Sequence, residues 1–210
     1  ISMGGSNTAF MELLLVLLPS LGRGIYVDHV LRNFTVGHVG IGRPSSMHCG
    51  AAPLCGVLVL ESGYGSGSYH HGEPAVHGLW PETGRYGTSQ CIQPKERADP
   101  SSTSPCYDDL SFMRHEWEKH GVCAGVQDSS DYFSQICSLS KAPLAVMQSL
   151  KGKGATLEEM ADALEEDQGY PVYYVDSSSD SQIYLSACSA GYGRPWQLAD
   201  VAEFSMKCHP

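Results

Sequence analysis

The stretch FMRHEWEKHGVC, from Phe112 to Cys123, decides how the rest of the sequence is interpreted. On a helix that turns by roughly 100° per residue, its polar residues fall on one continuous arc: His115, Glu116, Lys119 and His120. Leu110, Met113 and Trp117 fall on the other side of the same helical wheel. The stretch therefore predicts a helix that packs along one side and presents two imidazoles, a carboxylate and an ammonium group along the other.

The ends of this helix also have sequence signals. Asp108 or Asp109 can cap its first turn, because a carboxylate there accepts hydrogen bonds from unpaired backbone N–H groups. Gly121 is expected to end it in a left-handed turn.

The histidine pair has two other interpretations. Zinc peptidases use His-Glu-x-x-His, in which the histidines are four residues apart and both reach one metal ion. His115 and His120 are five residues apart and lie about 140° apart on the wheel, which argues against zinc chelation. The other interpretation is an exposed charged helix in which Glu116 contacts His120 one turn later.

A second stretch, VHGLWP from Val76 to Pro81, places His77 beside Trp80. Alone, it is typical of a histidine packed in a core. The two stretches together, in this order and with Cys91 between them and Cys123 after Gly121, resemble the active-site segments of the ribonuclease T2 family. The members of this family are acid endoribonucleases of secretory and vacuolar compartments, and the resemblance is firm over about residues 56 to 124 and looser to Cys208.

The resemblance implies an endoribonuclease that cleaves single-stranded RNA without metal, through 2′,3′-cyclic phosphates and with low base specificity. Such cleavage needs a base for the 2′-hydroxyl, an acid for the leaving oxygen and positive charge near the phosphorus. Family roles make His120 the base and His77 the acid, although the sequence leaves their exchange open. His115 would hold phosphate, and Glu116 and Lys119 would stabilise the transition state.

The residues that contact the RNA bases are less well defined. Trp80 can stack on a base or pack in the core, and both interpretations stay open. Glu82 and Tyr86 are weaker candidates for base contacts. The family usually has Gln-Trp-Pro where this chain has Glu61-Ser62-Gly63-Tyr64, so we expect poor discrimination at the downstream base.

The chain has eight cysteines without the Cys-x-x-Cys spacing of zinc sites: Cys49, Cys55, Cys91, Cys106, Cys123, Cys137, Cys188 and Cys208. An even number points to disulfides and an oxidising compartment. The family pattern implies that Cys91 pairs with Cys123 and Cys188 with Cys208, while the other four allow three pairings. Asn33 begins a glycosylation sequon.

The composition is that of one globular domain, with 210 residues of which 42% are hydrophobic. A formal net charge of −10 argues against a protein that binds nucleic acid through a basic surface. Protonating all nine histidines would bring that charge to about −1, so we expect an optimum near pH 5, from the usual histidine pKa of about 6.5. We expect RNA as the partner, and neither a cofactor, a metal, DNA nor a stable membrane contact. We also expect a monomer, secreted or vacuolar or lysosomal.

Residues 1–48 form an N-terminal extension of uncertain role, ahead of a catalytic domain at 49–210. Ala9 to Leu18 is almost wholly apolar but too short to span a bilayer. A packed extension and the remnant of a leader or propeptide are equally compatible with this run, and contact with a partner or a membrane is a weaker third interpretation.

The fold class expected is α+β, with a central helical region flanked by strands. The resemblance adds a mostly antiparallel central sheet stapled by disulfides. Strands are expected at 57–60, 172–175, 183–187 and 202–206, and helices at 132–139, 144–150 and 156–164.

A non-enzymatic alternative is a secreted, disulfide-rich protein with a ribonuclease fold that acts as a toxin or recognition factor. A missing catalytic residue would favour it, and none of the five is missing.

Overall fold

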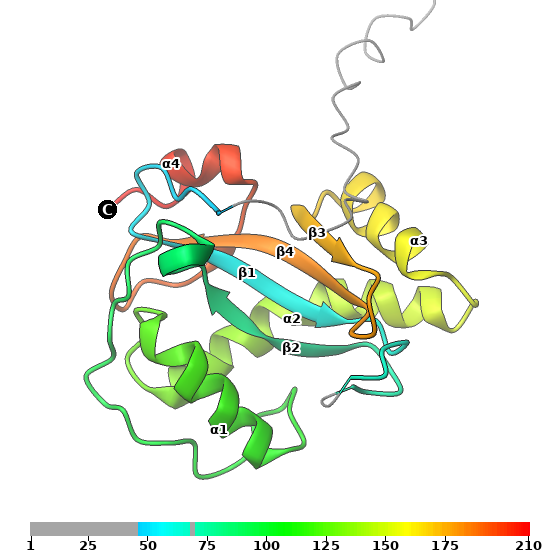
Figure 1. The fold of residues 1–210 in the computed structure, drawn as a ribbon, viewed down its shortest axis with the longest axis horizontal. Helices are drawn as coiled ribbons and strands as arrows, with labels where there is room; N and C mark the ends of the chain where they lie inside the picture. The colour runs from blue at the N-terminus through cyan, green and yellow to red at the C-terminus, as the bar shows by residue number, and fades with distance from the viewer. Residues whose placement is uncertain (1–45, 68–69) are drawn as a thin grey trace, which may run out of the picture. The chain divides into compact units, whose positions relative to one another are not determined.

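A five-stranded antiparallel sheet organises the part of the chain that the computed structural model describes, residues 46–67 and 70–210 (Figure 1). Its order is β2-β1-β4-β3, with the short β5 paired to β4. The strands are β1 (Leu54–Glu61), β2 (Ala75–Pro81), β3 (Val172–Asp176), β4 (Gln182–Ser189) and β5 (Gln197–Leu198). The expected α+β class and antiparallel sheet are therefore confirmed.

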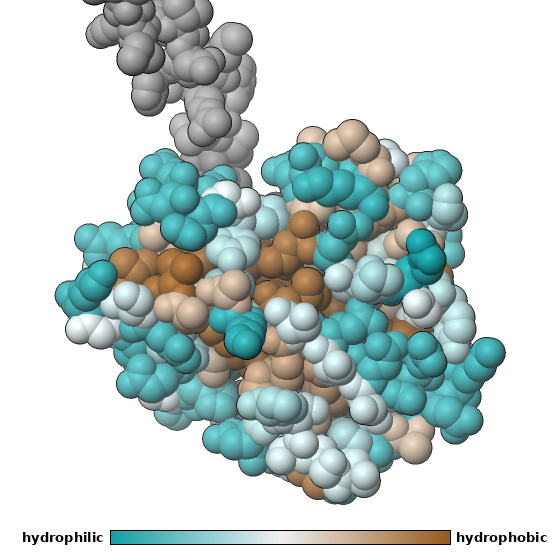
Figure 2. Space-filling model, turned by 180° about the vertical axis from the view of Figure 1, so that it is seen from behind, coloured by the Kyte–Doolittle hydropathy of each residue, from teal (hydrophilic) through white to brown (hydrophobic). Residues whose placement is uncertain are grey.

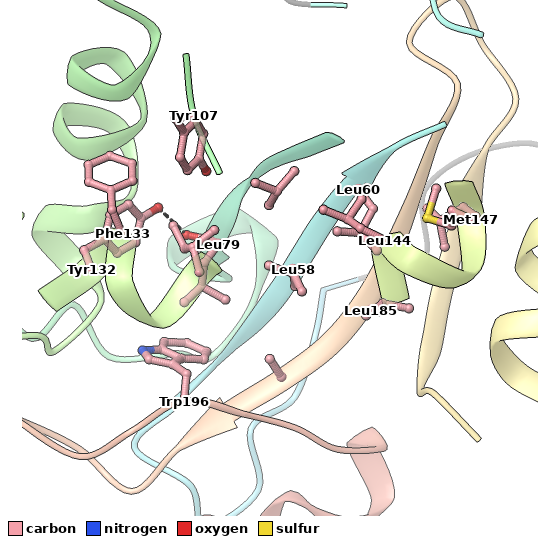
Figure 3. Close-up of a cluster of buried hydrophobic side chains, with 14 of the residues drawn as sticks. Leu58, Leu60, Leu79, Tyr107, Tyr132, Phe133, Leu144, Met147, Leu185 and Trp196 are labelled. Carbon is pink, nitrogen blue, oxygen red and sulfur yellow. Dashed lines mark hydrogen bonds between the residues drawn. The ribbon is translucent and has the colours of Figure 1, made fainter. Parts of the chain in front are cut away.

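The two central strands are buried along their whole length. One face of β1 contributes Leu58 and Leu60 to the larger core cluster, which Figure 3 shows, and the other contributes Val57 and Val59 to a second cluster. The expected half-buried alternation of 183–187 is thus wrong, because both faces of β4 are covered and all of its residues are buried.

The helices are α1 (Leu110–Lys119), α2 (Ser129–Lys151), α3 (Leu157–Asp162) and α4 (Phe204–Lys207). Shorter helical turns are η1 (Gly84–Tyr86), η2 (Gly121–Cys123), the π-helical η3 (Ala163–Asp167) and η4 (Val201–Glu203). Side chains of α2 belong to the larger core cluster, whereas Phe204 of α4 belongs to the second, so these helices cover opposite faces of the sheet. None of the described helices is both long and apolar enough to cross a membrane.

Helix α1 confirms the prediction made from the central stretch. The Asp109 side chain accepts from the N–H groups of Ser111 and Phe112, which makes it the N-cap. The end differs from the prediction, because Gly121 does not adopt a left-handed conformation and instead begins η2. A Cβ at Gly121 would lie 2.2 Å from Cε3 of Trp117, so close packing explains this glycine.

The two helices expected at 132–139 and 144–150 are one helix, α2, with Pro143 inside it. A proline removes one helical hydrogen bond and usually breaks a helix. Here the apolar positions before and after it continue one buried stripe, formed by Tyr132, Phe133, Ile136, Leu144 and Met147. Packing of that stripe on the sheet outweighs the local cost.

On the face seen in Figure 2, hydrophobic residues remain visible between hydrophilic ones.

The strand expected at 202–206 is also wrong, because this segment forms η4 and α4. The Asp200 side chain accepts from Ala202 N–H and caps the turn. Phe204 is buried while Met206 is 75% exposed, so the alternating pattern did not reflect a strand. The capping box of Thr156 and Glu159 is present and opens α3 as predicted.

Four disulfides staple the fold. Cys91 pairs with Cys123 and Cys188 with Cys208, as the family resemblance implied. The remaining bridges are Cys49–Cys55 and Cys106–Cys137. Each stabilises the fold by about 2–4 kcal/mol, mainly by restricting the unfolded chain.

The predicted glycosylation site, Asn33, and most of the N-terminal extension lie outside the described residues. Met47 is buried, and its backbone bonds to Tyr86 and Thr88. Residue 47, which the prediction assigned to the extension, therefore packs with the residues that follow it.

Candidate active site

His77 lies at the third position of β2, with its side chain only 15% exposed. The backbone carbonyl of His77 accepts a hydrogen bond from the hydroxyl of the buried Tyr107 at 2.9 Å. The imidazole makes edge contacts with Trp80 and Phe112, at centroid distances of 5.0 and 5.1 Å. The ring is thus held in an aromatic setting with limited access to water.

Two carboxylates contact the two ring nitrogens of His77. Oε1 of Glu61 lies 3.1 Å from Nδ1, and Oε1 of Glu116 lies 3.5 Å from Nε2. Burial lowers the pKa of His77, but hydrogen bonds and charge interactions with Glu116 and Glu61 outweigh it and raise this pKa from 6.5 to about 9. The structure therefore favours the protonated imidazole at neutral pH.

Glu116 is buried, with 1% of its surface exposed, although the helical wheel placed it on the polar arc that α1 presents. The wheel placed Glu116 on the correct side of α1, but that side faces β2 at this position and not solvent. Oε2 of Glu116 accepts a hydrogen bond from Nε1 of Trp80 at 2.8 Å. The carboxylate thus joins two side chains of β2 to the helix.

Gly78 makes this approach sterically feasible. A Cβ at this position would lie 2.0 Å from Oε2 of Glu116 and 2.8 Å from Nε1 of Trp80. Carbon and oxygen atoms cannot approach to 2.0 Å without a bond, so any side chain here would displace the carboxylate, the indole or the strand.

His120 follows α1 as its C-cap residue, and its backbone N–H donates to the carbonyl of Glu116 at 3.0 Å. Its imidazole stacks on Trp80 with a centroid distance of 4.8 Å and an interplanar angle of 17°. Trp80 therefore contacts both histidines. Its side chain is half-buried, so it is not packed wholly in the core, and the ring of His120 stacks on it.

The remaining predicted catalytic residues lie on the same helix. His115 is half-buried and Lys119 is exposed. They are four residues apart, so they lie on one side of α1. The contacts given above bring together His77, Trp80, Glu116 and His120.

The two weaker candidates for base contacts differ in accessibility. Glu82 is buried, with 3% of its surface exposed, and its backbone bonds to Cys55 and Ser89. Tyr86 is 43% exposed, and the guanidinium of Arg85 lies 4.7 Å from its ring centroid. Tyr86 is thus the more accessible of the two to a ligand.

Sequence reasoning missed two polar residues that contact His77. From the sequence, Glu61 stands out only as a departure from the family pattern, and Gln182 has no signal of its own. The two residues face each other across β1 and β4, and both are buried at 4%. The available signal was Glu61 at the end of an otherwise apolar strand, β1, whereas Gln182 begins a strand that also contains Ser186 and Ser189.

Within residues 46–67 and 70–210, no group of three or more His, Cys, Asp or Glu side chains is arranged to hold a metal ion.

Comparison with known proteins identifies the class. The model of the ribonuclease T2 family matches residues 67–187, more than half of the chain. The chain therefore belongs to the ribonuclease T2 family, which confirms the resemblance seen in the sequence.

Three relatives illustrate the similarity. Ribonuclease 1 of Arabidopsis thaliana is 28% identical over 142 residues, which cover 54% of this chain and 62% of the relative. Ribonuclease 3 of the same plant is 29% identical over 143 residues, covering 54% and 64%. Ribonuclease T2 of Sus scrofa is 34% identical over 95 residues, covering 38% and 46%. The chain thus spans less than two thirds of the length of these relatives.

One solved structure, described as Actibind, a T2 ribonuclease, covers 74% of this chain and 89% of its own. It has 19% sequence identity and a TM-score of 0.48.

Proposed function

We propose that this protein is an endoribonuclease that cleaves single-stranded RNA without metal, through 2′,3′-cyclic phosphates. The observation that carries this proposal is the joining of His77 and His120 through Trp80 and Glu116. These residues come from β2 and from α1 with its C-cap, the two segments that resemble the family's active site. Two imidazoles at one site can act as acid and base, because this side chain titrates near neutral pH.

His77 is the general acid in this mechanism. It must carry a proton when the 5′-oxygen leaves, and the carboxylates of Glu61 and Glu116 favour that charged form. With a carboxylate near each ring nitrogen, His77 stays protonated and so holds a proton for the leaving oxygen.

His120 is the general base and takes the proton of the 2′-hydroxyl. The 2′-oxygen then bonds to phosphorus, the bond from phosphorus to the 5′-oxygen breaks, and His77 protonates that oxygen. Stacking on Trp80 holds the imidazole of His120 in place. DNA lacks the 2′-hydroxyl and cannot enter this reaction.

Glu116 acts through His77 and Trp80, because it is buried and hydrogen-bonded to the indole. Lys119 is exposed and supplies positive charge to the phosphorane, while His115 holds phosphate. Tyr86 is the candidate for a base contact that is best exposed to solvent.

The substrate and setting follow from the same proposal. The partner is single-stranded RNA, bound by a monomer. Four disulfides support a secreted or vacuolar location, since such bonds persist in oxidising compartments.

The test is incubation of RNA with purified protein in EDTA, followed by analysis of the product ends. We expect 2′,3′-cyclic phosphates from RNA and no cleavage of DNA. His120→Ala should lower the rate by about 10²–10⁴-fold, whereas His48→Ala, which removes an exposed histidine, should not. An unchanged RNA ladder from folded protein would refute the proposal.

A further inference from the structure

Glu61 is a buried carboxylate at the end of β1, with 4% of its surface exposed. Its Oε1 contacts Nδ1 of His77 at 3.1 Å, and its Oε2 accepts from the backbone N–H of His71 at 3.2 Å. Both oxygens are therefore engaged. A buried carboxylate is costly unless such partners compensate it.

Gln182 lies on β4, the strand next to β1, and approaches the same nitrogen of His77. Its Nε2 lies 2.7 Å from Nδ1 of His77, and its Oε1 accepts from the hydroxyl of Tyr184 at 3.0 Å. The tyrosine belongs to the second core cluster, so the amide is supported from within the sheet.

These two contacts to Nδ1 make different demands on its proton. Nδ1 donates to Glu61 only when it carries a proton. A protonated Nδ1 also requires the amide oxygen of Gln182, whereas an unprotonated Nδ1 accepts from the amide nitrogen. An amide can present either end, so Gln182 can serve both states, but the Glu61 carboxylate can bond only to the protonated nitrogen.

We propose that Glu61 is a positioning residue that holds the Nδ1–H of His77, with Gln182 as the partner that adapts to the proton. Glu61 thereby maintains the charged imidazole and leaves Nε2 as the nitrogen that delivers a proton. The catalytic meaning of this assignment rests on the proposed function. The effect on protonation of His77 does not.

The other groups around His77 set the size of the effect. Glu116 of α1 faces Nε2, and the hydroxyl of Tyr107 bonds to the His77 carbonyl. Without the charge of Glu61, Glu116 remains as the carboxylate contacting the ring and burial still opposes the charged form. An opposite charge this close typically changes a pKa by about 1–3 units.

The test is Glu61→Gln, which keeps the shape of the side chain and removes its charge. The control is Glu158→Gln, which makes the same charge change at an exposed position of α3. The His77 ring protons are followed by NMR over pH. We expect the titration midpoint of His77 to fall by about one pH unit or more in Glu61→Gln, and to stay unchanged in the control. The alkaline limb of RNA cleavage should move in the same direction.

An equal midpoint in wild type and Glu61→Gln would overturn the inference, whether or not the protein cleaves RNA. A lowered midpoint in a protein that never cleaves RNA would uphold it and refute the proposed function. If Glu61→Gln does not fold, Glu61→Asp is the second variant, because its side chain is one methylene shorter and its carboxylate lies farther from Nδ1 of His77. A smaller fall is then expected, and no fall would overturn the inference.

Discussion

Substitution of Gly78 by alanine tests whether the buried carboxylate assembles the site. The change adds one methyl group to β2, between His77, which contacts Glu116, and Trp80, which contacts both Glu116 and His120. The new Cβ would lie 2.0 Å from Oε2 of Glu116 and 2.8 Å from Nε1 of Trp80. An ordinary contact between carbon and another heavy atom is about 3.5 Å, so the carboxylate or the strand must move by more than about 1 Å.

The magnitude follows from what this movement breaks. The hydrogen bond from Trp80 to Glu116, 2.8 Å long, involves a charged acceptor, and such bonds contribute about 1.5–3 kcal/mol. Overpacking adds typically about 1–3 kcal/mol. Part of this is relieved by movement, so we expect a loss of roughly 2–4 kcal/mol in the free energy of unfolding. A displacement of about 1 Å in an active site can also lower the rate by about 10²-fold.

The assays are chemical denaturation and cleavage of a short RNA at fixed pH. The control is Gly72→Ala, because a Cβ at Gly72 meets nothing within 4 Å. We expect the control to match wild type in both assays. If Gly78→Ala kept wild-type stability and rate, the close approach of Glu116 to Gly78 would not matter, and the account of how the site is assembled would be wrong.

Two further predictions concern the phosphate contact and the folded state. His115→Ala should raise KM for RNA more than it lowers kcat, and should be milder than His120→Ala; an equal loss in kcat would contradict a role in phosphate binding. Stability should depend on His77, whose folded pKa of about 9 lies above its unfolded value of 6.5. This contribution is complete below pH 6.5 and is lost as pH rises through about 9, a fall of up to roughly 3 kcal/mol. Urea unfolding at several pH values should show a weaker fall in Glu61→Gln, and equal slopes would contradict the linkage.

The fold could be predicted where local signals agreed with packing. The capped helix at 110–119 and the apolar strand at 57–60 both have periodicities that match what they bury. The segment 202–206 has too few residues to show its period, and its cap at Asp200 decided for a helix. Pro143 suggested a break that the continuous apolar stripe of α2 overrides.

The site could be predicted only in part, for a related reason. Wheel geometry put the polar residues of α1 together, but burial of Glu116 depends on β2, which lies far away in the sequence. Glu61 and Gln182 meet His77 through the register of three strands, which no local pattern encodes. Gly78 is explained only by the atoms across from it.

The pH dependence shows how two scales of charge act against each other in this protein. The net charge of −10 repels RNA at neutral pH, and protonating the histidines weakens that repulsion, which favours an acidic optimum. The local carboxylates of Glu61 and Glu116 have the opposite consequence, because they keep His77 protonated up to a pKa of about 9. Exposed charges are screened by salt within about 10 Å at 0.1 M, whereas the largely buried contacts to His77 are screened much less. Added salt should therefore weaken the repulsion of RNA at neutral pH and leave the alkaline limb of the pH–rate profile, which His77 sets, in place. An acidic optimum would then reflect approach of the polyanion, since the proposed acid, His77, remains protonated well above neutrality and the proposed base, His120, gains activity as pH rises.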